Sequence, residues 1–114
     1  MSKWADYVIT AVQYEPIYLN GEGKRIAAVE VRMDLGGRLG TAEIWTRQQV
    51  QDAINLDHET FATAVMSENK RWRRGAHVRL LRLYGLDYLR TDRIEIPGDH
   101  LGEIAELWYY PRGA

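Results

Sequence analysis

Residues 26–45, IAAVEVRMDLGGRLGTAEIW, carry the clearest strand pattern in this chain of 114 residues. From Ile26 to Asp34 apolar and polar side chains alternate, which predicts a half-buried strand. Gly36-Gly37 is typical of a hairpin turn, and Leu39–Trp45 is then the returning strand. The inward-facing residues of the first strand are expected to be Ala27, Val29, Val31 and Met33, and the outward-facing ones Glu30, Arg32 and Asp34.

One helix is predicted directly after this hairpin, from about Arg47 to Asn55. Thr46 can cap the helix, and Gln49 follows at the spacing of a capping box. Val50, Ala53 and Ile54 form one short apolar stripe. Because the stripe is short, the helix must pack on the sheet to be stable.

The remaining strands are predicted from β-branched and aromatic runs. They cover Tyr7–Tyr14, Thr60–Met66, His77–Tyr84 and Tyr88–Asp92, with a turn at Asn20–Gly23 and a charged loop or hairpin tip at Ser67–Gly75. Asp99 is placed to cap a short helical turn through Glu106. Together the elements predict a single α+β domain over residues 1–114. Its architecture would be a strongly bent antiparallel sheet or small open barrel of five to six strands, covered at one end by the main helix.

Composition limits the possible functions. The formal net charge is -1, so no global field attracts nucleic acid or an anionic membrane. The chain has no cysteine, which excludes disulfides, thiolate nucleophiles and cysteine-bound zinc. No apolar run approaches the roughly 18 residues that span a bilayer, and the N-terminus lacks the pattern of a signal peptide. We therefore expect a cytoplasmic protein with no membrane partner.

The charges are unevenly distributed along the chain. Between Ser67 and Tyr84 six cations accompany one acid, whereas between Asp87 and Glu106 six acids accompany two arginines. These two blocks could pair within the molecule or form separate faces.

The basic tip Lys70-Arg71-Trp72-Arg73-Arg74 is the strongest candidate binding site. Cations can neutralise phosphates, and an exposed indole can stack on an unpaired base. Tryptophan and arginine are also enriched at the centres of protein interfaces. The structural alternative is a solvated hairpin tip with Trp72 folded onto the core. Because the rest of the surface is not basic, any affinity for nucleic acid should be modest and sensitive to salt.

A second candidate surface is the apolar tail Leu107–Pro111, which is expected to dock on the body of the protein or on a partner. Its aromatic side chains are Trp108, Tyr109 and Tyr110.

The tract Tyr88-Leu89-Arg90-Thr91-Asp92, followed by Asp99-His100-Leu101-Gly102, resembles the C-terminal motif of domain-of-unknown-function family 3892. This is a group of small bacterial and phage-borne proteins. Tyr7–Val12 and Trp45–Phe61 are similar to other parts of the family, so the likeness covers most of the chain. The chain departs from the family pattern at His100, where asparagine is expected, and in the basic segment 70–74. The resemblance implies a single-domain fold and no assigned activity, so no catalytic residue is carried over.

No recognisable catalytic or metal-binding pattern occurs in the sequence. The three histidines lack the spacing of metal ligands on a helix, and Gly36–Gly40 lacks the lysine and helix of a phosphate loop. Asp92, Asp99, His100 and Glu103 come without a serine or cysteine nucleophile. We expect these positions to build turns, and we expect no cofactor and no metal.

The sequence therefore favours a small non-enzymatic binding module whose partner is a protein or a second copy of the chain, so that a homodimer is possible. The first alternative is a nucleic-acid-binding accessory protein that uses the tip Lys70–Arg74. The second is a phage or mobile-element inhibitor of a host enzyme or defence complex, which is supported only by the acidic block.

Overall fold

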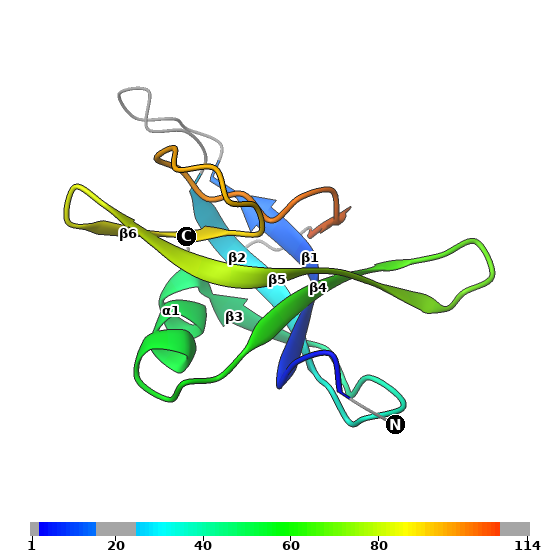
Figure 1. The fold of residues 1–114 in the computed structure, drawn as a ribbon. Coiled ribbons are helices and arrows are strands. Elements are labelled where there is room, and N and C mark those ends of the chain that lie inside the picture. The colour runs from blue at the N-terminus through cyan, green and yellow to red at the C-terminus, as the bar shows by residue number, and fades with distance from the viewer. Residues whose placement is uncertain (1–2, 16–24, 108–114) are drawn as a thin grey trace, which may run out of the picture.

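The computed structural model describes residues 3–15 and 25–107, which form one sheet with a helix packed on it (Figure 1). The sheet order is β3-β2-β1-β4-β5-β6, and β7 pairs with β1. This confirms an α+β fold, mostly sheet, with its main helix at the predicted residues. The elements are β1 (Tyr7–Tyr14), β2 (Ile26–Met33), β3 (Glu43–Thr46), α1 (Arg47–Asn55), β4 (Phe61–Met66), β5 (Trp72–Leu83), β6 (Leu86–Arg90) and β7 (Ala105–Glu106).

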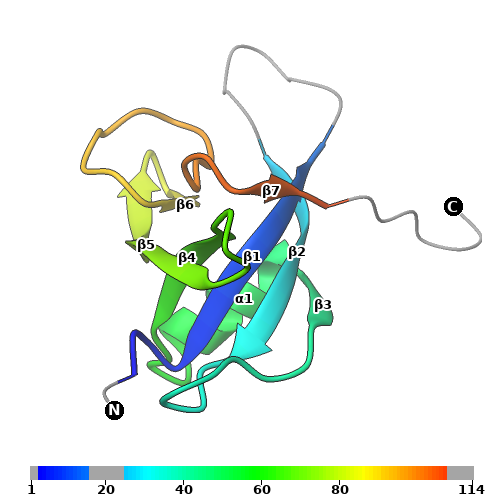
Figure 2. The same ribbon diagram turned by 90° about the vertical axis from the view of Figure 1, so that its right-hand side faces the viewer.

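The sheet is mixed, so the prediction of an antiparallel sheet is only partly right. β1 runs antiparallel to β2 but parallel to both β4 and β7. β4 and β7 share one edge of β1, with β4 along Tyr7–Ile9 and β7 along Ala11–Val12. Parallel neighbours need a long crossover, and here β2, β3 and α1 supply it. The sheet remains open, as Figure 2 shows.

Burial along β2 departs from the predicted alternation. Val29 and Val31 are buried as expected, but Ala27 and Met33 are exposed. Ala27 is the unpaired residue of a register shift, because Gln13 pairs with Ala28 and Tyr14 with Ile26. Met33 is the last residue of the strand.

Asp34, which was predicted to face water, is buried. Its carboxylate accepts hydrogen bonds from the backbone N–H groups of Trp4, Ala5 and Gly36 at 2.6, 3.4 and 2.9 Å. A buried carboxylate needs such donors to replace its hydration, and the N-terminal segment supplies two of them.

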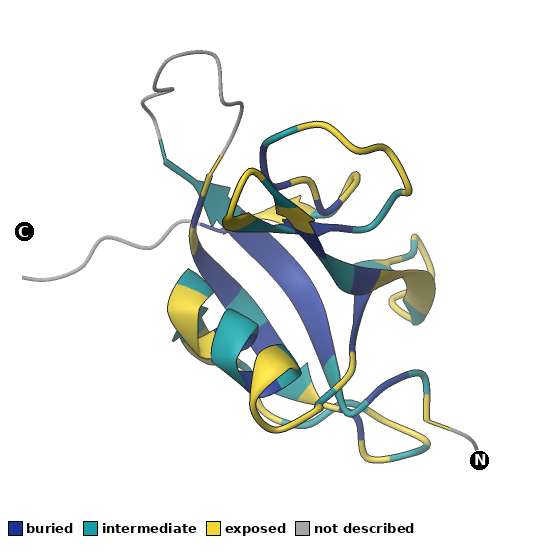
Figure 3. Ribbon diagram, turned by 60° about the vertical axis from the view of Figure 1, so that its left-hand side comes forward, coloured by how far each residue is buried: buried dark blue, intermediate teal, exposed yellow. Residues whose placement is uncertain are grey.

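The core lies between α1 and the sheet (Figure 3). Phe61 is fully buried, with its ring 5.3 Å from that of Tyr7 and 5.8 Å from that of Trp45. The predicted capping box of Thr46 and Gln49 is confirmed at the start of the helix. The buried apolar cluster consists of Ile9, Val12, Ile26, Val29, Val31, Val50, Ala53, Phe61, Val78, Leu89 and Leu101.

β5 begins earlier than predicted and takes part in two hairpins. Its first half pairs with β4 and its second half with β6, and the two hairpins project in opposite directions (Figure 1). The predicted loop over 67–75 is therefore shorter, because Trp72 already pairs with Met66. Gly75 is required in this ladder, since a Cβ there would lie 2.2 Å from Thr63 Oγ1.

The C-terminal region differs from its prediction. The helical turn expected from Asp99 to Glu106 does not form, and a bridge between Arg90 and His100 and the short strand β7 take its place. Leu107 is buried in a small second cluster with Ala11 and Ala28. The predictions for Trp108, Tyr109, Tyr110 and the turn at Asn20–Gly23 lie outside the described residues.

Candidate functional site

A cleft of ≈ 540 Å³ lies between the tip of the β4–β5 hairpin and the turn after β2. This volume lies within the usual range of ligand pockets. Three segments far apart in the sequence line the cleft, which we call the tryptophan cleft. Its lining residues are Trp4, Asp34, Gly36, Gly37, Arg38, Leu39, Lys70, Arg71 and Trp72.

Cations dominate the tryptophan cleft. Arg38, Lys70 and Arg71 are all exposed, and the single acid among the lining residues is Asp34. Asp34 accepts three backbone hydrogen bonds, and the three cations outnumber its single charge. The cleft can therefore attract an anion although the whole chain is close to neutral.

Trp72 is held in place by a cation–π contact with Arg32. The guanidinium carbon of Arg32 lies 5.4 Å from the centroid of the indole ring. Arg32 is itself anchored, because its Nη1 donates to the carbonyl oxygen of Gly40 at 3.1 Å. Trp72 is half-buried and belongs to neither apolar core cluster. Its ring is thus positioned at the cleft rather than folded onto the core.

The predicted basic tip is divided by the structure. Lys70, Arg71 and Trp72 line the tryptophan cleft, whereas Arg73 and Arg74 do not. The Nη2 of Arg74 instead lies 2.8 Å from Nε2 of the exposed His77. The sequence pointed to the tip but not to Trp4 or Arg38, which complete the cleft.

The motif on which the predicted resemblance to family 3892 rests surrounds Asp99, whose side chain is only 1% exposed. Arg47 binds this carboxylate with two hydrogen bonds, of 2.8 Å from Nε and 3.1 Å from Nη2. The backbone N–H groups of Ile26 and Leu89 complete the arrangement at 2.8 and 2.9 Å. Each oxygen of Asp99 thus accepts two hydrogen bonds, and the carboxylate joins β2, α1 and β6. We call this the Asp99 junction.

Arg90 organises the loop that leads to the Asp99 junction. Its Nε and Nη2 donate to the two carboxylate oxygens of Asp92 at 2.7 and 2.9 Å, and its Nη1 donates to the carbonyl of Gly98 at 3.0 Å. Arg90 is buried while Asp92 is partly exposed. The pair closes a turn, in which Asp92 also accepts a hydrogen bond from the Ile94 N–H at 3.2 Å.

The rest of the motif is also held mainly by backbone contacts. Leu101 is buried, and its N–H donates to the Tyr14 hydroxyl at 3.0 Å. Gly102 adopts a positive φ of 77°. The exposed His100 bonds to Leu89 and Thr91 through its backbone, so the position that departs from the family pattern requires no particular side chain. Tyr88 pairs with Leu81 in the β5–β6 ladder.

Asp92 should make stability depend on acid pH. The hydrogen bond from Arg90 lowers the pKa of Asp92 from 3.8 to about 2. Its contribution to stability is then complete above pH 3.8 and is lost as the pH falls toward 2. We expect Asp92→Asn to lower the urea midpoint at pH 5 by a small amount, because the pair is partly exposed, and the gap to the unmodified protein to be clearly smaller at pH 2.5. An equal gap at both pH values would contradict this assignment.

The described residues contain no group of three or more histidine, aspartate or glutamate side chains arranged to hold a metal ion. Within the same ranges, no helix is both long and apolar enough to cross a bilayer.

Comparison with protein-family models, with curated proteins and with solved structures gave no match to this chain. The resemblance to family 3892 therefore stays a prediction.

Proposed function

We propose that this protein binds single-stranded nucleic acid in the tryptophan cleft. The observation that carries the proposal is the convergence of two tryptophans and three basic residues, from three separate segments, on one concave surface. Unpaired bases stack on aromatic side chains regardless of their sequence, and cations pair with the phosphates. The cleft provides both kinds of group.

The composition of the cleft favours a ligand with both a base and a phosphate. A simple anion would use Arg38, Lys70 and Arg71 but neither indole. Bases in a duplex are stacked on one another, so their faces are not available to Trp4 and Trp72. A single strand presents both features at once. Since the net charge is -1, attraction is local and should weaken steeply with salt.

Two double variants distinguish this cleft from general positive charge on the hairpin. Lys70→Gln with Arg71→Gln removes two cations that line the cleft, whereas Arg73→Gln with Arg74→Gln removes two that do not. We expect the first pair to weaken binding of a labelled oligothymidylate about tenfold and to lower the salt slope by roughly 0.7 per cation. The second pair should change the affinity less than about threefold. Fluorescence anisotropy at about 50 and 200 mM salt measures both quantities.

Equal losses of affinity in the two double variants would show that the hairpin attracts nucleic acid through its general positive charge and not through the tryptophan cleft. If the unmodified protein does not bind the oligonucleotide at the lower salt concentration, the proposal is wrong.

A protein partner is the second candidate, and one observation favours it. Tyr84 is 91% exposed at the tip of the β5–β6 hairpin and has a φ of 52°, a left-handed conformation that is costly for tyrosine. Leu86 beside it is also exposed. Aromatic side chains of this kind often anchor protein interfaces. A monomeric mass by light scattering at high micromolar concentration would rule out self-association through this hairpin.

Self-association through Trp108–Tyr110 and inhibition of a host complex stay predictions from the sequence.

A further inference from the structure

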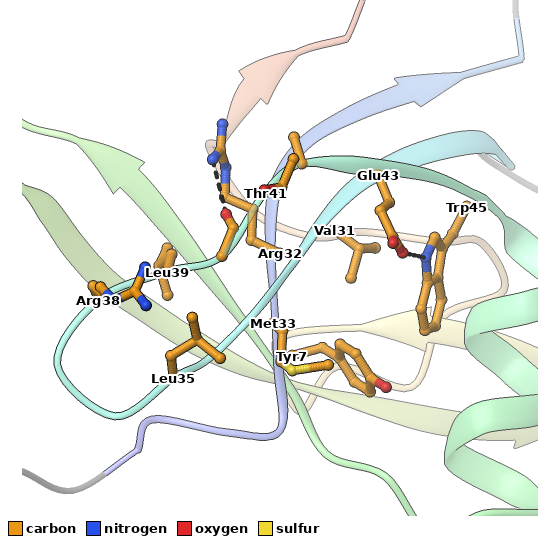
Figure 4. Close-up of a pocket in the computed structure, with 12 residues that line it drawn as sticks. Tyr7, Val31, Arg32, Met33, Leu35, Arg38, Leu39, Thr41, Glu43 and Trp45 are labelled. Carbon is orange, nitrogen blue, oxygen red and sulfur yellow. Dashed lines mark hydrogen bonds between the residues drawn. The ribbon is translucent and has the colours of Figure 1, made fainter.

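A second hollow adjoins the tryptophan cleft. This β2–β3 groove, of ≈ 820 Å³, lies between β2, β3 and the turn that joins them. The tryptophan cleft and the β2–β3 groove share Arg38 and Leu39 in their walls. Figure 4 shows the rings of Tyr7 and Trp45 at one end of the groove, with Arg38 and Leu39 at the other.

The groove exists because the ladder between β2 and β3 stops early. Pairing ends at Val31 and Glu43, although a strand from Leu39 onward was predicted. Closer to the turn, Gly40 N–H bonds to the carbonyl of Met33 at 2.8 Å. Asp34 and Leu39 also form a bridge at the turn, so Thr41 and Ala42 are the residues between these contacts and the ladder. The segment that connects β2 to β3 therefore forms one wall of the groove.

One end of the groove is aromatic. The ring centroids of Tyr7 and Trp45 are 5.0 Å apart, and both rings pack on the buried Phe61. The Trp45 indole N–H donates to the Glu43 carboxylate at 3.1 Å. Glu43 is the one acidic residue among those that line the groove. Arg32 and Arg38 are the cations among the lining residues. An aromatic end together with two lining cations suits a base joined to a phosphate.

We infer, on the basis of the proposed function, that the ligand is a strand of at least two nucleotides and not a free mononucleotide. One base occupies the tryptophan cleft, and the next nucleotide enters the β2–β3 groove. Arg38 is exposed in the wall shared by both hollows, so its planar guanidinium can pair with the phosphate that joins the two nucleotides. A mononucleotide fills only one hollow. Affinity should therefore rise with oligonucleotide length and depend little on base sequence.

A length series with groove variants tests this inference. We expect a thymidine tetranucleotide to bind at least about tenfold more tightly than thymidine monophosphate. Met33→Ser with Leu35→Ser changes two exposed residues that line only the groove. This variant should weaken the tetranucleotide about five- to tenfold and leave the mononucleotide within about twofold. Ile44→Ser is the control, because Ile44 is similarly exposed on β3 and lines neither hollow. Competition against a labelled tetranucleotide measures both ligands, and circular dichroism verifies that the variants are folded.

The outcomes separate this inference from the proposed function. If no ligand of any length binds, the proposed function is wrong and the inference fails with it. If the mononucleotide and the tetranucleotide bind equally well, the ligand is confined to the tryptophan cleft and only the inference is wrong. If Met33→Ser with Leu35→Ser binds the tetranucleotide as tightly as Ile44→Ser does, the inference is also wrong and the proposed function is unaffected.

Discussion

Replacing Asp99 by asparagine is expected to lower the free energy of unfolding by about 3–5 kcal/mol. The amide keeps the shape of the side chain but removes the counter-ion of Arg47, whose side chain is only 13% exposed. The amide nitrogen also cannot accept the hydrogen bond of the donor that it faces. Since small domains have about 5–15 kcal/mol in total, this variant should lose a large share of its stability. Urea denaturation followed by circular dichroism measures the loss.

Two further variants serve as controls for the Asp99 junction. His100→Asn installs the residue of the suspected family at an exposed neighbouring position and should change stability by less than about 0.5 kcal/mol. Adding Arg47→Met to Asp99→Asn should restore part of the stability, because removing both charges costs less than leaving the Arg47 charge buried without its partner. A loss below about 1 kcal/mol for Asp99→Asn alone would show that the junction does not hold the fold together.

The variant Trp72→Ala is expected to weaken binding of single-stranded oligonucleotides by about 5- to 150-fold. A stacked base and aromatic side chain contribute about 1–3 kcal/mol, and alanine removes that contact. Trp72→Phe keeps a ring on Arg32 and should lose less than about fivefold. Anisotropy titrations at low salt measure the three affinities.

Tyr84→Ala is the matched aromatic control for Trp72→Ala. Tyr84 is exposed on the opposite hairpin and lines neither hollow, so its loss should leave the affinity unchanged. If Trp72→Ala binds as tightly as the unmodified protein, stacking in the tryptophan cleft plays no part in recognition.

The features that the sequence predicted correctly depend on neighbouring residues. The start of the helix follows from Thr46 and Gln49, whose reciprocal hydrogen bonds span three residues. The burial of Val29 and Val31 follows from side-chain alternation within one strand. Local rules of this kind need no knowledge of the partner strand.

The features that could not be predicted from the sequence depend on contacts between distant residues. Arg47 and Asp99 are 52 positions apart, and no local pattern indicates that they meet. Asp34 was assigned to the surface because its donors at Trp4 and Ala5 come from another segment. The parallel pairing of β1 with β4 is likewise set by a crossover and not by either strand alone.

The candidate site shows the same division. The tip at Lys70–Arg74 was evident from its composition, since four cations flank one indole in a chain of almost no net charge. Trp4 and Arg38 join the tip only through the folding of the N-terminal segment and the turn after β2. In the sequence, Trp4 is only a tryptophan near the N-terminus, and Arg38 is only an arginine in a glycine-rich turn. Neither residue indicates a cleft by itself.

The indole N–H signals in a nitrogen–proton correlation spectrum test the tryptophan cleft most directly. The chain has four tryptophans, and Trp4→Phe and Trp72→Phe assign the two signals that matter. We predict that titration with an oligothymidylate at low salt shifts the Trp4 and Trp72 signals together, along one saturable curve. If both signals stay in place at an oligonucleotide concentration that saturates binding, single-stranded nucleic acid does not occupy this cleft.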